Sequence, residues 1–165
     1  VDVVAAHGGS GEFDALLRLY RDAATPQEEL RALSALGQFP DAELTLRLCE
    51  MCRTEVRSQN APYVLAQAMS NPVCGAAVWE FVASNWDELV GRFPSSSIAR
   101  MVGGIRAFSE PVLVAGIQAF FVEHPVTNAA LTVQQHLERV RVNVAARRRL
   151  EADGLGALRE GAAPA

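Results

Sequence analysis

The chain has 165 residues, of which half are hydrophobic, and its net charge is −4. This length suits one domain or one stack of helices, and the hydrophobic fraction is enough for a sizeable core. The acidic balance argues against recruitment of nucleic acid or anionic lipid by a general basic field. No apolar run approaches the roughly 20 residues of a membrane span, so we expect no membrane partner. Alanine, leucine and valine predominate, which favours helices over sheets.

The first part of the chain predicts three amphipathic helices. An apolar segment over residues 1–7 is followed by a glycine-rich break over residues 8–11. Thr25 has the position of a helix cap, with Pro26 at the first helical position and Glu28 at capping-box spacing. A third helix is predicted to begin at Pro40-Asp41. The apolar faces of these helices are formed by Phe13, Leu16, Leu17 and Tyr20, then Leu30, Leu33 and Leu36, then Leu44, Leu48 and Met51.

The middle of the chain contains a polar loop and an aromatic helix. Residues 53–60 are polar and predict a loop, and residues 61–69 predict a short helix. Asn71-Pro72 then signals the start of another helix. Its apolar stripe, with a kink expected near residues 84–85, consists of Val78, Val82, Trp86 and Leu89.

Three further helices are predicted in the last part. The first is indicated by apolar residues between Ile98 and Ile105. Ser109 is predicted to cap the second, which ends at His124-Pro125, and Thr127 is predicted to cap a long final helix. After Asp153 the sequence is rich in glycine and alanine, and we expect residues 153–165 to form a flexible tail.

The sequence therefore predicts an all-α fold of eight or nine helices with short connections. Helices joined by short loops pack as antiparallel hairpins, and stacked hairpins bury the stripe that each leaves open. We expect a curved solenoid of stacked helical hairpins, HEAT-like or armadillo-like, with a concave side. No fixed sequence period is evident.

The cysteines and histidines of the chain favour a structural role over a metal or redox site. Cys49 and Cys52 form a C-x-x-C, but they lie within a predicted helix and lack nearby ligands, so we interpret them as small apolar core residues. The three histidines are isolated, and no His-Glu-x-x-His occurs. A catalytic zinc requires such a pair of imidazoles together with a third ligand. We therefore predict no catalytic and no metal-binding residue in this chain.

The polar loop is the candidate binding segment. Arg57 and Gln59 lie within it, and Tyr63 follows it closely. An arginine fork suits a carboxylate, so this loop is a candidate peptide contact. The alternative is an exposed turn with no ligand. For Trp79 and Trp86, core packing is the default and a domain interface is the alternative.

Several stretches, in their order along the chain, resemble one family, the C-terminal helical domain of the aminopeptidase N family, in particular its puromycin-sensitive branch. These stretches are residues 4–9, 16–20, 35–37, 55–62, 77–82, 85–89, 92–93, 120–125, 132–135 and 138–143. Two positions differ from the family pattern: Asn60 stands where an aspartate is usual, and Ala146 stands where a tryptophan is frequent.

The resemblance implies a non-catalytic domain, residues 1–152, of a longer zinc aminopeptidase that removes N-terminal residues from peptides. In that family, zinc is held by a separate catalytic domain, over which the helical domain closes a chamber that controls peptide access. The implied partners are thus the catalytic domain of the same parent chain and a peptide substrate. Residues 1–7 are expected to be the end of a severed helix. The implied peptide-binding residues are Arg57, Gln59 and Tyr63; no catalytic residue can be transferred.

Two other functions compete with this one. The chain can be a stand-alone helical-repeat module that binds a protein or peptide on its concave face. An independent enzyme of unknown chemistry is a third possibility. We expect a cytoplasmic location and, if the chain is a severed domain, an exposed apolar patch where a neighbour docks.

Overall fold

Every regular element is helical in the computed structural model, which describes residues 8–161 and the side chains of residues 8–154. The all-α prediction is confirmed for this part of the chain. The α-helices are α2 (Ser10–Arg21), α3 (Pro26–Leu36), α4 (Ala42–Thr54), α5 (Ala61–Met69), α6 (Gly75–Ser84), α7 (Trp86–Arg92), α8 (Ser95–Met101), α9 (Pro111–Glu123) and α10 (Ala130–Gly161). Two 3₁₀ helices, η1 (Val102–Ala107) and η2 (Thr127–Ala129), complete the set.

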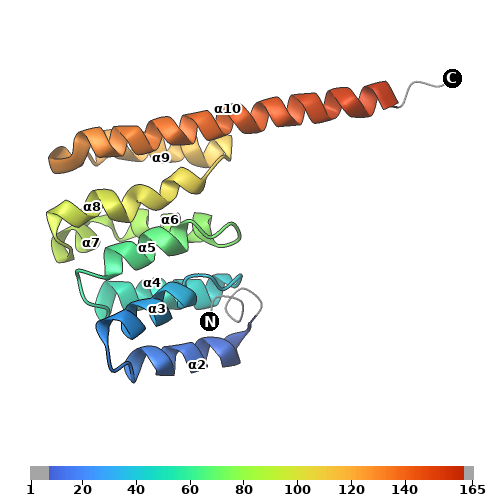
Figure 1. The fold of residues 1–165 in the computed structure, drawn as a ribbon. Helices are drawn as coiled ribbons and strands as arrows, with labels where there is room; N and C mark the ends of the chain where they lie inside the picture. Colours follow the sequence, from blue (N-terminus) through green and yellow to red (C-terminus); the bar gives the residue numbers. More distant parts are fainter. Residues whose placement is uncertain (1–7, 162–165) are drawn as a thin grey trace.

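The helices are stacked from α2 at one end to α10 at the other, and the chain reverses direction between successive layers (Figure 1). Helix α5 occupies the middle of the stack, where it packs on α3, α4, α6, α8 and η1. The final helix α10 packs on η1 and α9, and its C-terminal part projects beyond the other helices (Figure 1). A concave side and a HEAT-like repeat stay predictions.

The helix starts follow the local sequence signals. The hydroxyl of Thr25 accepts a hydrogen bond from the N–H of Glu28 (3.2 Å), while the Glu28 carboxylate accepts one from the N–H of Thr25 (3.1 Å). Asp41 caps α4 by accepting a hydrogen bond from the N–H of Leu44 (3.0 Å). Each cap satisfies an N–H group that has no partner inside its helix.

Four predicted boundaries are wrong by a few residues. The helix whose start Asn71-Pro72 signals is α6, which begins only at Gly75. Helix α4 continues through Thr54, so only residues 55–60 connect it to α5. The cap of α9 is Glu110, not Ser109, because Pro111 occupies the first helical position. Thr127 begins a short 3₁₀ turn, and α10 starts only at Ala130.

The aromatic stripe divides into two helices at Asn85, whose side-chain amide donates to the carbonyl of Phe81 (2.8 Å). Trp79 and Trp86 are buried, so the core interpretation is confirmed for both. Their rings lie 5.2 Å and 5.3 Å from that of Phe120, both edge-on. Edge-to-face packing of this kind joins α6 and α7 to α9.

Met69, at the end of α5, lies very close to η1 and to the start of α6. A Cβ atom on Gly104 of η1 would lie 2.6 Å from Met69 Cβ and 2.4 Å from the carbonyl oxygen of Ala66. A Cβ atom on Gly75 would lie 2.2 Å from the carbonyl oxygen of Met69. Both positions therefore require glycine, because any side chain would displace buried neighbours.

Asn71, in the connection between α5 and α6, and Asn143, within α10, each donate to two backbone carbonyls far earlier in the chain. The amide nitrogen of Asn71 donates to the carbonyls of Gly37 (3.3 Å) and Phe39 (3.0 Å). Asn143 repeats this geometry on Arg106 (2.7 Å) and Phe108 (3.2 Å). Carbonyls near the ends of helices lack partners inside the helix, and these amides supply them.

Three other side chains make the same kind of contact. Gln67 donates to the carbonyl of Ser34, Arg92 to that of Val56 and His136 to that of Ala99. The acceptor carbonyls of this whole set lie 32 to 37 residues before the donors. These bonds therefore join residues separated by a similar length of chain in every case.

The two ends of the chain bear on the predicted domain limits. Helix α10 continues past Asp153 to Gly161. The domain limits of 1–152 stay a prediction. The flexibility predicted for residues 153–165 stays a prediction. The helix predicted for residues 1–7 lies outside the described residues.

We predict that Asn71→Ala destabilises the protein by about 1–3 kcal/mol, because it removes the amide that donates to the carbonyls of Gly37 and Phe39. Urea unfolding followed by circular dichroism measures the change. Asn128→Ala is the matched control because Asn128 is exposed, and it should change stability by less than about 0.5 kcal/mol. Equal stability of the two variants would contradict the structural role of Asn71.

Candidate functional site

The connection between α4 and α5 carries the residues that the sequence analysis singled out. Val56 anchors it, because its side chain is fully buried and its N–H donates to the carbonyl of Met51 (2.8 Å). Arg92, at the end of α7, donates to the carbonyl of Val56. A tight turn then leads into α5, with the N–H of Asn60 donating to the carbonyl of Arg57 (2.8 Å). The connection is thus held at its start and exposed in its middle.

Arg57 is exposed, and its guanidinium lies 3.4 Å from the carboxylate of Glu29 on α3. The Arg57 side chain is 69% exposed whereas that of Glu29 is only 12% exposed, so the ion pair joins an exposed guanidinium to a partly buried carboxylate. Tyr20 lies close by: burial, followed by the negative charge of Glu29, raises the pKa of its phenol. The arginine is therefore already paired, and a ligand carboxylate would compete with Glu29 for it.

Tyr63 faces another part of the stack. Its side chain is 47% exposed, and the guanidinium of Arg100 on α8 lies 5.2 Å from the centre of its ring. This distance is typical of a cation–π contact. Gln59 is exposed on the turn. The structure thus places Arg57 beside α3 and Tyr63 beside α8, and it does not show the three residues converging on one pocket.

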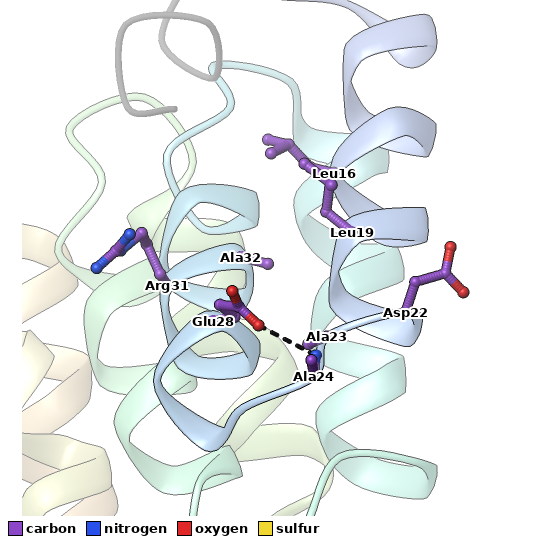
Figure 2. A pocket seen from close by; sticks show the side chains of 8 residues that line it. All are labelled: Leu16, Leu19, Asp22, Ala23, Ala24, Glu28, Arg31 and Ala32. Atoms are coloured by element: carbon purple, nitrogen blue, oxygen red, sulfur yellow. Dashed lines mark hydrogen bonds between the residues drawn. The ribbon is translucent and has the colours of Figure 1, made fainter.

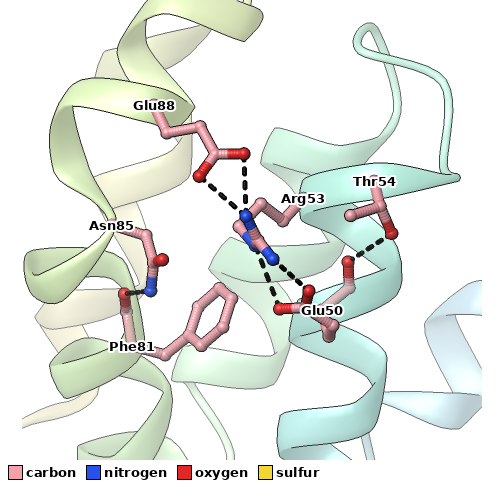
Figure 3. Close-up of polar contacts among 6 residues, drawn as sticks. All are labelled: Glu50, Arg53, Thr54, Phe81, Asn85 and Glu88. Carbon is pink, nitrogen blue, oxygen red and sulfur yellow. Dashed lines mark hydrogen bonds and ion pairs between the residues drawn. The ribbon is translucent and has the colours of Figure 1, made fainter.

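A second arginine of this region was assigned to the loop by the sequence analysis but lies at the end of α4. Arg53 donates to both carboxylate oxygens of Glu88 on α7 (2.9 Å and 2.8 Å) and also pairs with Glu50 one turn earlier (Figure 3). These contacts raise the pKa of Arg53, and the Arg53 hydrogen bond lowers that of Glu50. The spacing of Glu50 and Arg53 was visible in the sequence, but Glu88 was not a predictable partner.

The end of the stack at α2 and α3 carries an apolar groove with a volume of about 350 Å³. Figure 2 shows Leu16 and Leu19 on α2 and Ala32 and Arg31 on α3 around it. Leu19 is 59% exposed, which is unusual for leucine in a packed helix. The exposed apolar patch expected from the sequence has a counterpart here.

The C-x-x-C residues are core residues, as the sequence analysis interpreted them. Cys49 and Cys52 are buried free thiols. Burial raises the pKa of Cys49 to about 12 and that of Cys52 well above its usual range. A buried thiol with a raised pKa is a poor nucleophile, because the nucleophile is the thiolate.

The residues that the structure describes contain no group of three or more histidine, cysteine, aspartate or glutamate side chains arranged to hold a metal ion. None of their helices combines the length and the apolar character needed to cross a membrane.

Comparison with known proteins identifies the family. The family described as ERAP1-like C-terminal domain matches residues 1–142. The chain belongs to the ERAP1-like C-terminal domain family. This match confirms the resemblance to the C-terminal helical domain of the aminopeptidase N family; the puromycin-sensitive branch stays a prediction.

Relatives of this ERAP1-like domain include named aminopeptidases. The chain is 32% identical to aminopeptidase M1-B of Oryza sativa subsp. japonica over 135 residues, which are 79% of this chain. It is 29% identical to mitochondrial aminopeptidase 2 of Saccharomyces cerevisiae (84% of this chain) and 26% identical to glutamyl aminopeptidase of Mus musculus (83% of this chain). In each comparison the chain spans about 15% of the length of the relative.

Proposed function

We propose that this chain is the non-catalytic C-terminal domain of a longer zinc aminopeptidase, in which it encloses the active-site chamber and shapes peptide access. The observation that carries the proposal is the family match over residues 1–142, combined with the 15% of each relative's length that the chain covers. A domain of this share leaves ample room in such a relative for a separate catalytic domain.

The described residues contain no group of three or more histidine, cysteine, aspartate or glutamate side chains arranged to hold a metal ion, and the thiols of Cys49 and Cys52 are buried. The proposal therefore assigns zinc to the catalytic domain of the parent enzyme, and no chemical step of the reaction to this chain. The proposed contribution of this chain is to bind some peptides and to exclude others. A helical stack packed against the chamber limits which peptides reach the metal and for how long.

The proposed peptide contacts are Arg57, Gln59 and Tyr63. Their exposure supports this role, because a peptide can reach all three without any rearrangement of the core. Glu29 adds a specific element, since a peptide carboxylate would have to take over its place beside Arg57. Tyr63 likewise already has a partner, because the guanidinium of Arg100 lies over one side of its ring.

The proposal is tested by comparing the product of the complete gene with the 165-residue chain alone. We predict that the complete product contains His-Glu-x-x-His before this domain and hydrolyses amino-acid anilides, whereas the isolated chain does not, even with added zinc. Hydrolysis by the isolated chain would favour an independent enzyme. A complete gene that lacks the zinc motif would favour the stand-alone binding module.

The role of Arg57 is tested in the full-length enzyme. We predict that Arg57→Ala raises KM about tenfold for peptides and leaves KM for single-residue anilides unchanged, because an anilide is too short to reach the loop. Steady-state kinetics on both substrates measures this difference.

Glu29→Gln is the matched control, because it removes the same ion pair but keeps the guanidinium. It should leave the peptide KM unchanged or lower it. If both variants raise the peptide KM equally, Arg57 acts only by supporting the structure; equal kinetics of Arg57→Ala on both substrates would remove it from the proposed site.

A further inference from the structure

A polar groove lies between the end of α5, η1 and α10, away from the α4–α5 connection. It has a volume of about 580 Å³, and its lining includes Ser70, Gly103, Arg106, Gln135, His136 and Arg139. None of its lining residues is acidic. Such a groove gathers positive charge without an internal counter-charge.

Arg106 on η1 and Arg139 on α10 both line this groove, whereas two other arginines of α10 are paired with acids. Arg141 lies 3.3 Å from Glu138, and Arg147 lies 3.2 Å from Glu110 and 2.8 Å from Glu151. Arg106 and Arg139 form no ion pair within the part of the chain that the structure describes. Two unpaired guanidinium groups on one groove repel each other, and a bound anion relieves this repulsion.

The groove is held in place by the backbone contacts of its own elements. Arg106 donates through Nε to the carbonyl of Gly103 (3.0 Å), which fixes the start of its guanidinium and leaves the Nη groups available. His136 donates from Nε2 to the carbonyl of Ala99 (3.1 Å). Asn143 ties the carbonyl of Arg106 to α10 (2.7 Å). The two arginines therefore stand on elements whose relative position is fixed, which reduces the cost of ordering them around a ligand.

His136 adds no positive charge to this groove near neutral pH. Burial, and more weakly the charge of Arg106, lowers its pKa from the usual value of about 6.5. The charge of the groove thus comes from the two guanidinium groups of Arg106 and Arg139. The side-chain amide of Gln135 supplies a further uncharged donor on the same lining.

We infer that the groove between η1 and α10 binds a single oxyanion group, a carboxylate or a phosphate, between Arg106 and Arg139. Guanidinium forks match the paired oxygens of these two groups and form short, charge-assisted hydrogen bonds with them. The volume accommodates such a group together with a few atoms of the molecule that carries it. This site does not depend on the proposed peptidase function, since its charge and geometry belong to this chain alone.

Titration of the 165-residue chain, followed by NMR of the backbone amides and the arginine Nε–H groups, tests the site. The probes are inorganic phosphate, N-acetyl-Ala-Ala with a free carboxylate, and the same peptide as its amide, at constant ionic strength set with chloride. We expect saturable shifts at Arg106 and Arg139 and at the amide of Gly103 with phosphate, with the peptide acid, or with both. A response to only one of the two identifies the source of the oxyanion, and no response is expected from the peptide amide.

The variant Arg106→Gln/Arg139→Gln should bind the responding probe at least about tenfold more weakly. The matched control Arg141→Gln/Arg148→Gln removes the same charge from exposed positions of α10 and should bind as the unchanged chain does. Circular dichroism verifies that both variants are folded.

Absence of a saturable shift with either oxyanion would overturn the proposal. So would equal binding by the two double variants, or an equal response to the peptide amide, because each would show that the arginines do not recognise the oxyanion group.

Discussion

The fold depends on hydrogen bonds from side chains of one hairpin to backbone carbonyls of the hairpin before it. Asn71 and Asn143 each serve two carbonyls, and Gln67, Arg92 and His136 each serve one. Apolar burial is non-directional and would permit neighbouring hairpins to slide, whereas these bonds fix one register. The close approach of Gly75 and Gly104 to α5 at Met69 and Ala66 has the same effect, because it allows only one depth of packing. The relative position of the helices is thus set by contacts between hairpins rather than by contacts within them.

Both surfaces with proposed functions follow from this arrangement. Arg92 holds the start of the α4–α5 connection through Val56, so that Arg57 stays beside Glu29 at the edge of α3. His136 and Asn143 hold α10 against η1, so that Arg106 and Arg139 face one groove. In each case a paired or buried group fixes the backbone and leaves an exposed arginine for a ligand. The two sites therefore combine a rigid support with a solvent-accessible charge.

The sequence predicted the helices and much of the core, because these depend on local spacing and capping. The Thr25–Glu28 capping box, the short helix 61–69 and the buried Trp79 and Trp86 are visible in the order of residues alone. The partners of charged residues were not predictable, since Glu29, Glu88 and Arg100 meet Arg57, Arg53 and Tyr63 only through the stacking of distant helices. The groove at η1 was not predictable for the same reason, because its two arginines lie on separate elements. Pro111 also shows how one residue moves a cap by a single position.

Native-state hydrogen exchange tests most directly the claim that contacts between hairpins hold the fold. Helix α5 is covered by neighbours on several sides, whereas α2 lies at the end of the stack, next to an apolar groove. The account predicts that the amides of α5 exchange only through global unfolding and that those of α2 exchange through smaller local openings. Exchange of α5 as fast as α2, under conditions in which the protein is folded, would contradict it.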